Sequence, residues 1–169
     1  MTASDSRPRR LQRWKLRLLN LYPPLSGAGI RVRRLASEPL AFESSIRLRF
    51  WNANYVGTHY GGSLYSMCDP FLMLILVEAL GPAYAVWDKA ATIRFRRPGR
   101  GRVSARFEIP AARIAEIRAE AERAERAEPL FRVEVRDEAG EVVAEVEKLI
   151  SVKRKTAAPE SAAPRSNGG

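Results

Sequence analysis

The sequence predicts an α+β fold in which an antiparallel sheet covers one long apolar helix. Residues 61–80 are apolar on almost every side, which is typical of an enclosed helix. The flanking segments alternate apolar and polar residues with a period of two, which predicts strands with one buried face. Because these strands follow one another in adjacent runs, the sheet is expected to be antiparallel. A helix this apolar requires a strongly curved sheet, a partner surface or both.

The first predicted element is a short basic amphipathic helix over residues 11–21. Its apolar residues recur at spacings of three and four, and Pro23 and Pro24 are expected to stop it. Packing on the body of the domain is the simpler interpretation of this helix. Contact with an anionic membrane is the alternative.

The remaining elements follow from periodicity and turn residues. Ile30 and Val32 indicate a first strand, and a second is expected over residues 46–51, where Leu48 and Phe50 continue the alternation. After the long helix we expect, in order, strands at 84–97 and 102–109, a charged surface helix at 111–127, and a hairpin of 131–135 with 142–152 around a turn at 137–140.

The length of 169 residues fits one domain. We expect a flexible N-terminus at 1–9, the folded domain at 10–152, and a disordered tail at 153–169, where nothing can be buried. The single cysteine, Cys68, excludes an internal disulfide and a CxxC metal site, and it is interpreted as a small core residue. The start of the chain lacks a signal-peptide pattern, which favours a cytoplasmic protein. The apolar run Phe71 to Val77 is too short to span a membrane and predicts a buried helix.

The formal net charge of +10 allows a polyanionic partner such as nucleic acid, anionic lipid or the phosphates of coenzyme A. A nucleic-acid-binding protein is the less favoured of these interpretations. The sequence contains no helix-turn-helix signature, zinc pattern or aromatic RNA-binding motif.

The most informative stretch is NYVGTHYGGSLYSMCD, from Asn54 to Asp69, where an extended segment passes through two glycines into the apolar helix. It resembles the motif of the PaaI-type hotdog thioesterases. Asn54, Gly57, Gly61, Gly62 and Asp69 fall at the positions of that motif without a gap. The segment WDKAATIRFRRPGRG, residues 87–101, looks like a bacterial branch of the same superfamily, and the likeness covers roughly residues 10–152.

The resemblance implies a hotdog fold, in which a curved antiparallel sheet wraps around a long central helix. It also implies a homodimer or homotetramer that hydrolyses a fatty or aromatic acyl-coenzyme A at a dimer-interface site. No metal and no cofactor are expected, since coenzyme A enters as part of the substrate. A noncatalytic hotdog domain that binds acyl-CoA or lipid is the alternative.

The physical chemistry of the motif fits hydrolysis. The N–H groups of Gly61 and Gly62 at a helix start could polarise a thioester carbonyl, although paired glycines also mark tight turns. Asp69 would be the nucleophile or the base that activates water, and Asn54 would position that water or the thioester. Eight residues of helix separate Gly61 from Asp69 by about 12 Å, so if both act on one carbonyl, the carboxylate must come from the other subunit. A purely structural alternative is that Asp69 caps a helix restarted by Pro70.

The sequence departs from the motif at one place. Active members have histidine immediately before the glycines, whereas this chain has Tyr60, which is expected to line the acyl pocket. Its only histidine, His59, is assigned either a turn role or a place beside the substrate with Gly57 and Thr58.

Three arginines are the candidates for binding the phosphates of coenzyme A. Guanidinium groups suit phosphate, but alternating arginines also suit the solvated face of a strand. The three are Arg94, Arg96 and Arg97.

Overall fold

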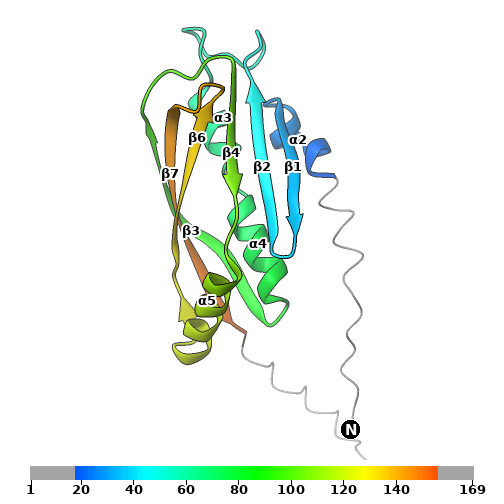
Figure 1. Ribbon diagram of the computed structural model, residues 1–169, viewed down its shortest axis with the longest axis vertical. Coiled ribbons are helices and arrows are strands. Elements are labelled where there is room, and N and C mark those ends of the chain that lie inside the picture. Colours follow the sequence, from blue (N-terminus) through cyan, green and yellow to red (C-terminus); the bar gives the residue numbers. More distant parts are fainter. Residues whose placement is uncertain (1–17, 156–169) are drawn as a thin grey trace, which may run out of the picture.

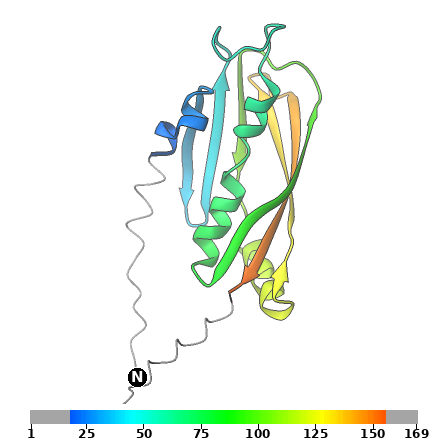
Figure 2. The ribbon, with the colours of Figure 1, turned by 180° about the vertical axis from the view of Figure 1, so that it is seen from behind.

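The computed structural model describes residues 18–155 and consists of one antiparallel sheet packed on a central helical segment. Figure 1 views the molecule with the sheet in front, and Figure 2 shows the helical segment lying along the opposite face. The strands are β1 (Ile30–Ser37), β2 (Leu40–Arg47), β3 (Tyr84–Phe95), β4 (Arg102–Phe107), β5 (Arg126–Ala127), β6 (Leu130–Asp137) and β7 (Val142–Arg154).

The sheet has the order β1-β2-β4-β6-β7-β3, and β5 pairs with β7. All of its pairings are antiparallel. The long strand β3 therefore lies at one edge of the sheet, with β7 on one side and no partner strand among residues 18–155 on the other. The predicted α+β class and the antiparallel sheet around a central helix are confirmed.

The central helical segment consists of α3 (Gly61–Ser66) and α4 (Phe71–Leu80), separated at residues 67–70. Pro70 removes a backbone N–H and ends the regular pattern, as proline does within a helix. The buried face of α4 packs into a core in which Phe71 lies 5.4 Å from Phe42 and 4.6 Å from Phe107, measured between ring centroids. By length and composition, the stretch of residues 61–80 could cross a membrane. The core helix of a globular protein can meet the same criteria, and half of this stretch is buried within the protein.

The second strand differs from its prediction. β2 ends at Arg47, and Phe50 and Trp51 are exposed in a turn instead of continuing the alternation. Asn52 causes this turn, because its side chain accepts a hydrogen bond from the Arg49 N–H and donates to the Arg47 carbonyl. The polar side chain thus overrides the period-two pattern.

The charged helix α5 (Ala111–Arg123) is shorter than predicted. Glu125 has a φ of 61°, and Arg126 and Ala127 leave the helix to pair with β7. Strong helix formers continue through this segment, so sheet pairing outweighs local propensity here. The predicted hairpin of β6 and β7 is confirmed, with Gly140 at a φ of 81° in its turn and the Asp137 carboxylate accepting two backbone N–H groups.

The N-terminal prediction lies largely outside the described residues. Leu18–Leu21 forms a 3-10 turn, and the rest of the expected amphipathic helix and its membrane alternative fall before it. Pro23 starts the short helix α2 (Pro23–Ser26) instead of only ending an element, because proline suits the first helical position. At the other end, β7 continues to Arg154, so the sheet extends two residues into the segment predicted as a disordered tail.

Candidate functional site

Asp69 lies in the break between α3 and α4, and its carboxylate is bound by one residue of α3 and one of β7. The Asp69 Oδ1 accepts a hydrogen bond from the Tyr65 hydroxyl at 2.9 Å and from the Lys148 ammonium at 2.9 Å. Pro70 is the N-cap of α4, and no side chain caps that helix. The structural alternative that Asp69 acts as a helix cap is therefore wrong. Its side chain is 48% exposed, so part of the carboxylate remains open.

Lys148 is the centre of this cluster and was missed by the sequence reasoning. It occupies β7 in register with the core-facing residues Val146 and Ile150, and its side chain is fully buried. Its ammonium also donates to the Asp88 Oδ2 at 2.8 Å. The signal was present in the sequence, because a lysine stands where period two places an apolar residue.

Asp88 reaches the cluster because of a β-bulge. The register between β3 and β7 shifts between Asp88 and Ala90, which leaves Lys89 as the extra residue. A bulge reverses the faces of the residues that follow it. Asp88 therefore faces the core together with Ala91 and Ile93, whereas Trp87, which strict alternation would place on the face of Ala91 and Ile93, lies on the other one. Periodicity alone cannot reveal a bulge, so the sequence does not predict that Asp88 reaches this cluster.

Titration in this cluster follows from its burial and its pairs. Burial lowers the pKa of Lys148, but hydrogen bonds to Asp88 and Asp69 outweigh it and leave that pKa raised, so the ammonium stays charged at neutral pH. Burial and the hydrogen bond to Asp69 raise the pKa of the Tyr65 phenol, which stays a donor. Burial raises the pKa of the neighbouring Cys68 thiol to about 12, which fits the predicted inert core residue.

A second feature is a pocket of about 490 Å³ at the start of α3. The backbone of Gly61 packs closely on the Phe95 ring. A Cβ added at Gly61 would lie only 2.9 Å from the Phe95 Cζ. Neither the Gly61 nor the Gly62 N–H donates a hydrogen bond to another residue in the part of the chain that is described. The site residues that line the pocket are Asn54, Thr58, His59, Gly61, Arg96 and Arg97. Asp69 does not line it, so one copy of the chain does not bring the carboxylate and this helix start together.

The loop before α3 is held by Asn54. Its side-chain amide donates to the Thr58 hydroxyl at 2.8 Å, and its carbonyl oxygen accepts the backbone N–H groups of Val56 and Thr58. Gly57 at the tip of this loop has a φ of 75°, which favours glycine. The Asn54 amide is thus engaged within its own loop.

His59 and Tyr60 point in different directions. His59 is 3% exposed, and its Nε2 lies 3.1 Å from the Gly101 carbonyl oxygen. Because a carbonyl only accepts, Nε2 carries the proton, and the buried Nδ1 has no partner within residues 18–155. Burial lowers the pKa of His59 despite the hydrogen bond to Gly101, so the ring is neutral at pH 7. Tyr60 is 60% exposed, and its ring lies over Gly62. A Cβ added at Gly62 would lie only 2.5 Å from the Tyr60 Cε1.

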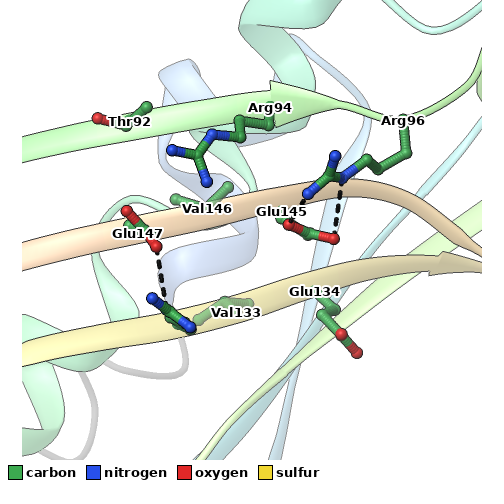
Figure 3. A pocket seen from close by; sticks show the side chains of 9 residues that line it. Thr92, Arg94, Arg96, Val133, Glu134, Glu145, Val146 and Glu147 are labelled. Carbon is green, nitrogen blue, oxygen red and sulfur yellow. Dashed lines mark hydrogen bonds and ion pairs between the residues drawn. The ribbon is translucent and has the colours of Figure 1, made fainter.

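Two of the three arginines predicted to bind phosphate, Arg96 and Arg97, are already paired with carboxylates. Figure 3 shows Arg94 and Arg96 over a second pocket, of about 330 Å³, formed by β3, β7 and β6. Arg96 donates to both oxygens of Glu145, at 2.9 and 2.6 Å, and Arg97 lies 2.9 Å from the Asp137 Oδ2. By register Arg94 lies opposite Glu145, on the face away from Ile93 and Val146. Arg94 is therefore separated by the sheet from the face that carries Asp69, whereas Arg96 lines both this pocket and the pocket at the start of α3.

Comparisons with solved structures place this fold among thioesterases. The probable thioesterase PA5026 of Pseudomonas aeruginosa, a protein of unknown function, matches with a TM-score of 0.68 and 26% identity over 85% of this chain and 96% of that chain. Thioesterase HI1161 of Haemophilus influenzae matches with a TM-score of 0.60 and 15% identity over 82% and 88% of the two chains. A Chlorobaculum tepidum protein of unknown function, OLEI01261, matches with a TM-score of 0.65 and 15% identity over 85% and 94%.

No curated protein matches the sequence. A family model does match, over residues 12–152, and its description is a domain of unknown function, DUF4442. This range contains both the Asp69 cluster and the pocket at Gly61. The chain belongs to the DUF4442 family, and its structural neighbours place it in the hotdog-fold thioesterase superfamily.

Proposed function

We propose that this protein hydrolyses an acyl-coenzyme A thioester at a site shared by two copies of the chain. The observation that carries the proposal is the Asp69 carboxylate, which is held on one oxygen by Lys148 and Tyr65 and remains half exposed. The carboxylate does not cap α4, so capping does not account for it. A fixed and accessible carboxylate is what a general base or nucleophile needs.

The reaction needs only water and the thioester. Asp69 removes a proton from water, whose oxygen adds to the carbonyl carbon, or it attacks that carbon itself and water later releases the acyl group. The carbon–sulfur bond breaks, and the thiol of coenzyme A leaves with a proton. The Gly61 and Gly62 N–H groups would stabilise the carbonyl oxygen as it gains negative charge.

The open edge of β3 supports a site shared between two copies. This strand has 12 residues, and its side opposite β7 has no partner strand in the described sheet. Exposed apolar residues on it include Trp87 at 41% and Phe95 at 55%. A long exposed edge is a template for another strand, and a two-fold axis would pair β3 with its own copy. Phe95 touches Gly61 and Asp88 contacts Lys148, so this edge adjoins both halves of the proposed site.

The test is an assay of the purified protein with short, long and aromatic acyl-CoAs, following free thiol. We expect thiol release by the wild type and its loss in Asp69→Asn, with light scattering giving twice the chain mass of 18.9 kDa for both proteins. Loss of activity together with loss of the dimer would not implicate Asp69. Hydrolysis that survives in a dimeric Asp69→Asn protein would contradict the proposed role.

A second candidate is an acyl-CoA-binding domain without turnover. It is favoured by Tyr60, which stands where active members have histidine, and by His59, whose ring is fixed by Gly101. Calorimetry with a nonhydrolysable acyl-CoA thioether separates the two functions. Binding of the thioether without thiol release from any acyl-CoA would favour this candidate.

A further inference from the structure

Lys148 is a charged residue in a place where charge is costly. It faces the core between Val146 and Ile150, and no other Lys, Arg, Asp or Glu is buried within the described residues. Burying an unpaired ammonium costs several kcal/mol, and a hydrophobic residue of similar size is often at least as stable as a buried ion pair. Stability alone therefore gives no reason for lysine at this position.

The three hydrogens of the ammonium are directed at two acidic residues. They are donated to the Asp69 Oδ1, the Asp69 backbone carbonyl and the Asp88 Oδ2, at 2.9, 2.5 and 2.8 Å. An ammonium group has three donors and no acceptor, so its hydrogen bonding is complete. Lys148 thus fixes both the backbone and the side chain of Asp69, and it ties the break between α3 and α4 to the bulge of β3.

The two contacts on Asp69 select one of its oxygens. Lys148 and Tyr65 both donate to Oδ1, whereas Oδ2 accepts no hydrogen bond from any described residue. Two carboxylates surround one ammonium, so the cluster has one negative charge in excess. The Asp88 Oδ1 is buried without a partner in the described part of the chain, whereas the Asp69 side chain is half exposed. The excess charge is therefore accessible at Asp69.

We propose that Lys148, itself oriented by Asp88, is a positioning residue that holds the Asp69 carboxylate with its Oδ1 bound and its Oδ2 free to act. This inference rests on the proposed function, since it names what orients the acting group. Lys148 does not contact substrate, because its side chain is fully buried. Its effect passes through the orientation of Asp69 and so belongs to the chemical step, not to substrate binding.

Kinetics of Lys148→Met test the inference. We expect kcat to fall about a hundredfold, as a displacement near 1 Å of an acting group does, with KM unchanged within about twofold. The variant Lys148→Met/Asp69→Asn should be no slower than Asp69→Asn, because the two residues act as a unit. The matched control is Lys89→Met, which removes the same charge from an exposed neighbour of Asp88 paired with Glu128 and should retain wild-type kcat.

Lys148→Met leaves the partly buried Asp88 carboxylate without its ammonium partner and could unfold the protein. The variant Lys148→Met/Asp88→Asn keeps the net charge and removes the unpaired carboxylate, and it should show the same loss of kcat in a folded dimer. Unchanged kcat in this folded variant, or a change confined to KM, would overturn the inference.

A crystal structure of Lys148→Met/Asp88→Asn separates failure of this inference from failure of the proposed function. We expect the Asp69 carboxylate to leave its wild-type rotamer. If Asp69 keeps its position there, Lys148 does not position it, whether or not the wild type hydrolyses thioesters. If Asp69 moves but no acyl-CoA is hydrolysed by the wild type, the proposed hydrolysis fails and the positioning contact stands.

Discussion

The Tyr65 hydroxyl donates to the Asp69 Oδ1 across one turn of chain, at 2.9 Å. The two residues are four apart, but α3 ends at Ser66, so the contact spans the break between the helices. This hydrogen bond and the ammonium of Lys148 approach the same oxygen from different elements. The orientation of Asp69 is thus fixed locally by α3 and over a long sequence distance by β7.

Tyr65→Phe is expected to lower the free energy of unfolding by about 1 kcal/mol, because it removes one partly buried hydrogen bond. Urea denaturation followed by circular dichroism measures this change. Tyr55→Phe is the matched control, since that side chain is fully exposed and its loss of hydroxyl should change nothing measurable. Equal stability of the two variants would show that the Tyr65 contact contributes nothing in solution.

Acid should destabilise the protein through His59. Burial lowers its pKa below the ordinary value of 6.5, so the unfolded chain binds a proton at a pH where the folded protein does not. Stability is therefore present above pH 6.5 and falls as the pH decreases toward the lower pKa of the folded state. Because this is the only histidine, His59→Asn should lose less stability than the wild type between pH 7.5 and about 5. Parallel pH curves for the two proteins would contradict the assignment.

Gly57→Ala should destabilise the loop before α3. A Cβ at this position meets open space, but the φ of 75° is unfavourable for alanine by about 1–2 kcal/mol. Gly57→Asn provides the comparison, because asparagine tolerates this conformation and should cost less than alanine. Chemical denaturation of the three proteins gives the order, and an alanine variant as stable as the asparagine variant would show that the loop relaxes.

Glu145→Gln tests whether the arginines of β3 contact coenzyme A. Two hydrogen bonds from Arg96 engage the Glu145 carboxylate, which would compete with a phosphate for the same guanidinium. If Arg96 binds coenzyme A, Glu145→Gln should strengthen binding of free coenzyme A several-fold in calorimetry, and a further Arg96→Gln change should abolish the gain. Unchanged affinity would assign these arginines to a solvated sheet face.

The sequence predicted the architecture well because long periodic segments dominate this fold. The apolar central segment and the alternating strands β3, β4, β6 and β7 each follow from one face being buried. The predicted ends of β2 and α5 were wrong because of the Asn52 turn and the pairing of Arg126 with β7. Neither cause is visible in periodicity, since the first is a side-chain hydrogen bond within the turn and the second depends on a distant segment of chain.

The candidate site was only partly predictable. Asp69 and the Gly61 segment came from the resemblance, and their separation within one copy follows from helix length. The Lys148 contact was not predicted, because it depends on a bulge that places Asp88 and on the pairing of residues 60 positions apart. A lysine in the apolar register of a strand was nevertheless a visible signal.

The bulge in β3 decides which charge faces Lys148. The extra residue, Lys89, sets which face every residue before it presents to the core. If the same sequence paired in strict alternation, Lys89 would lie opposite Ile150 on the core face, and Asp88 would lie on the outer face. The bulge thus places a carboxylate where a second ammonium would otherwise meet Lys148.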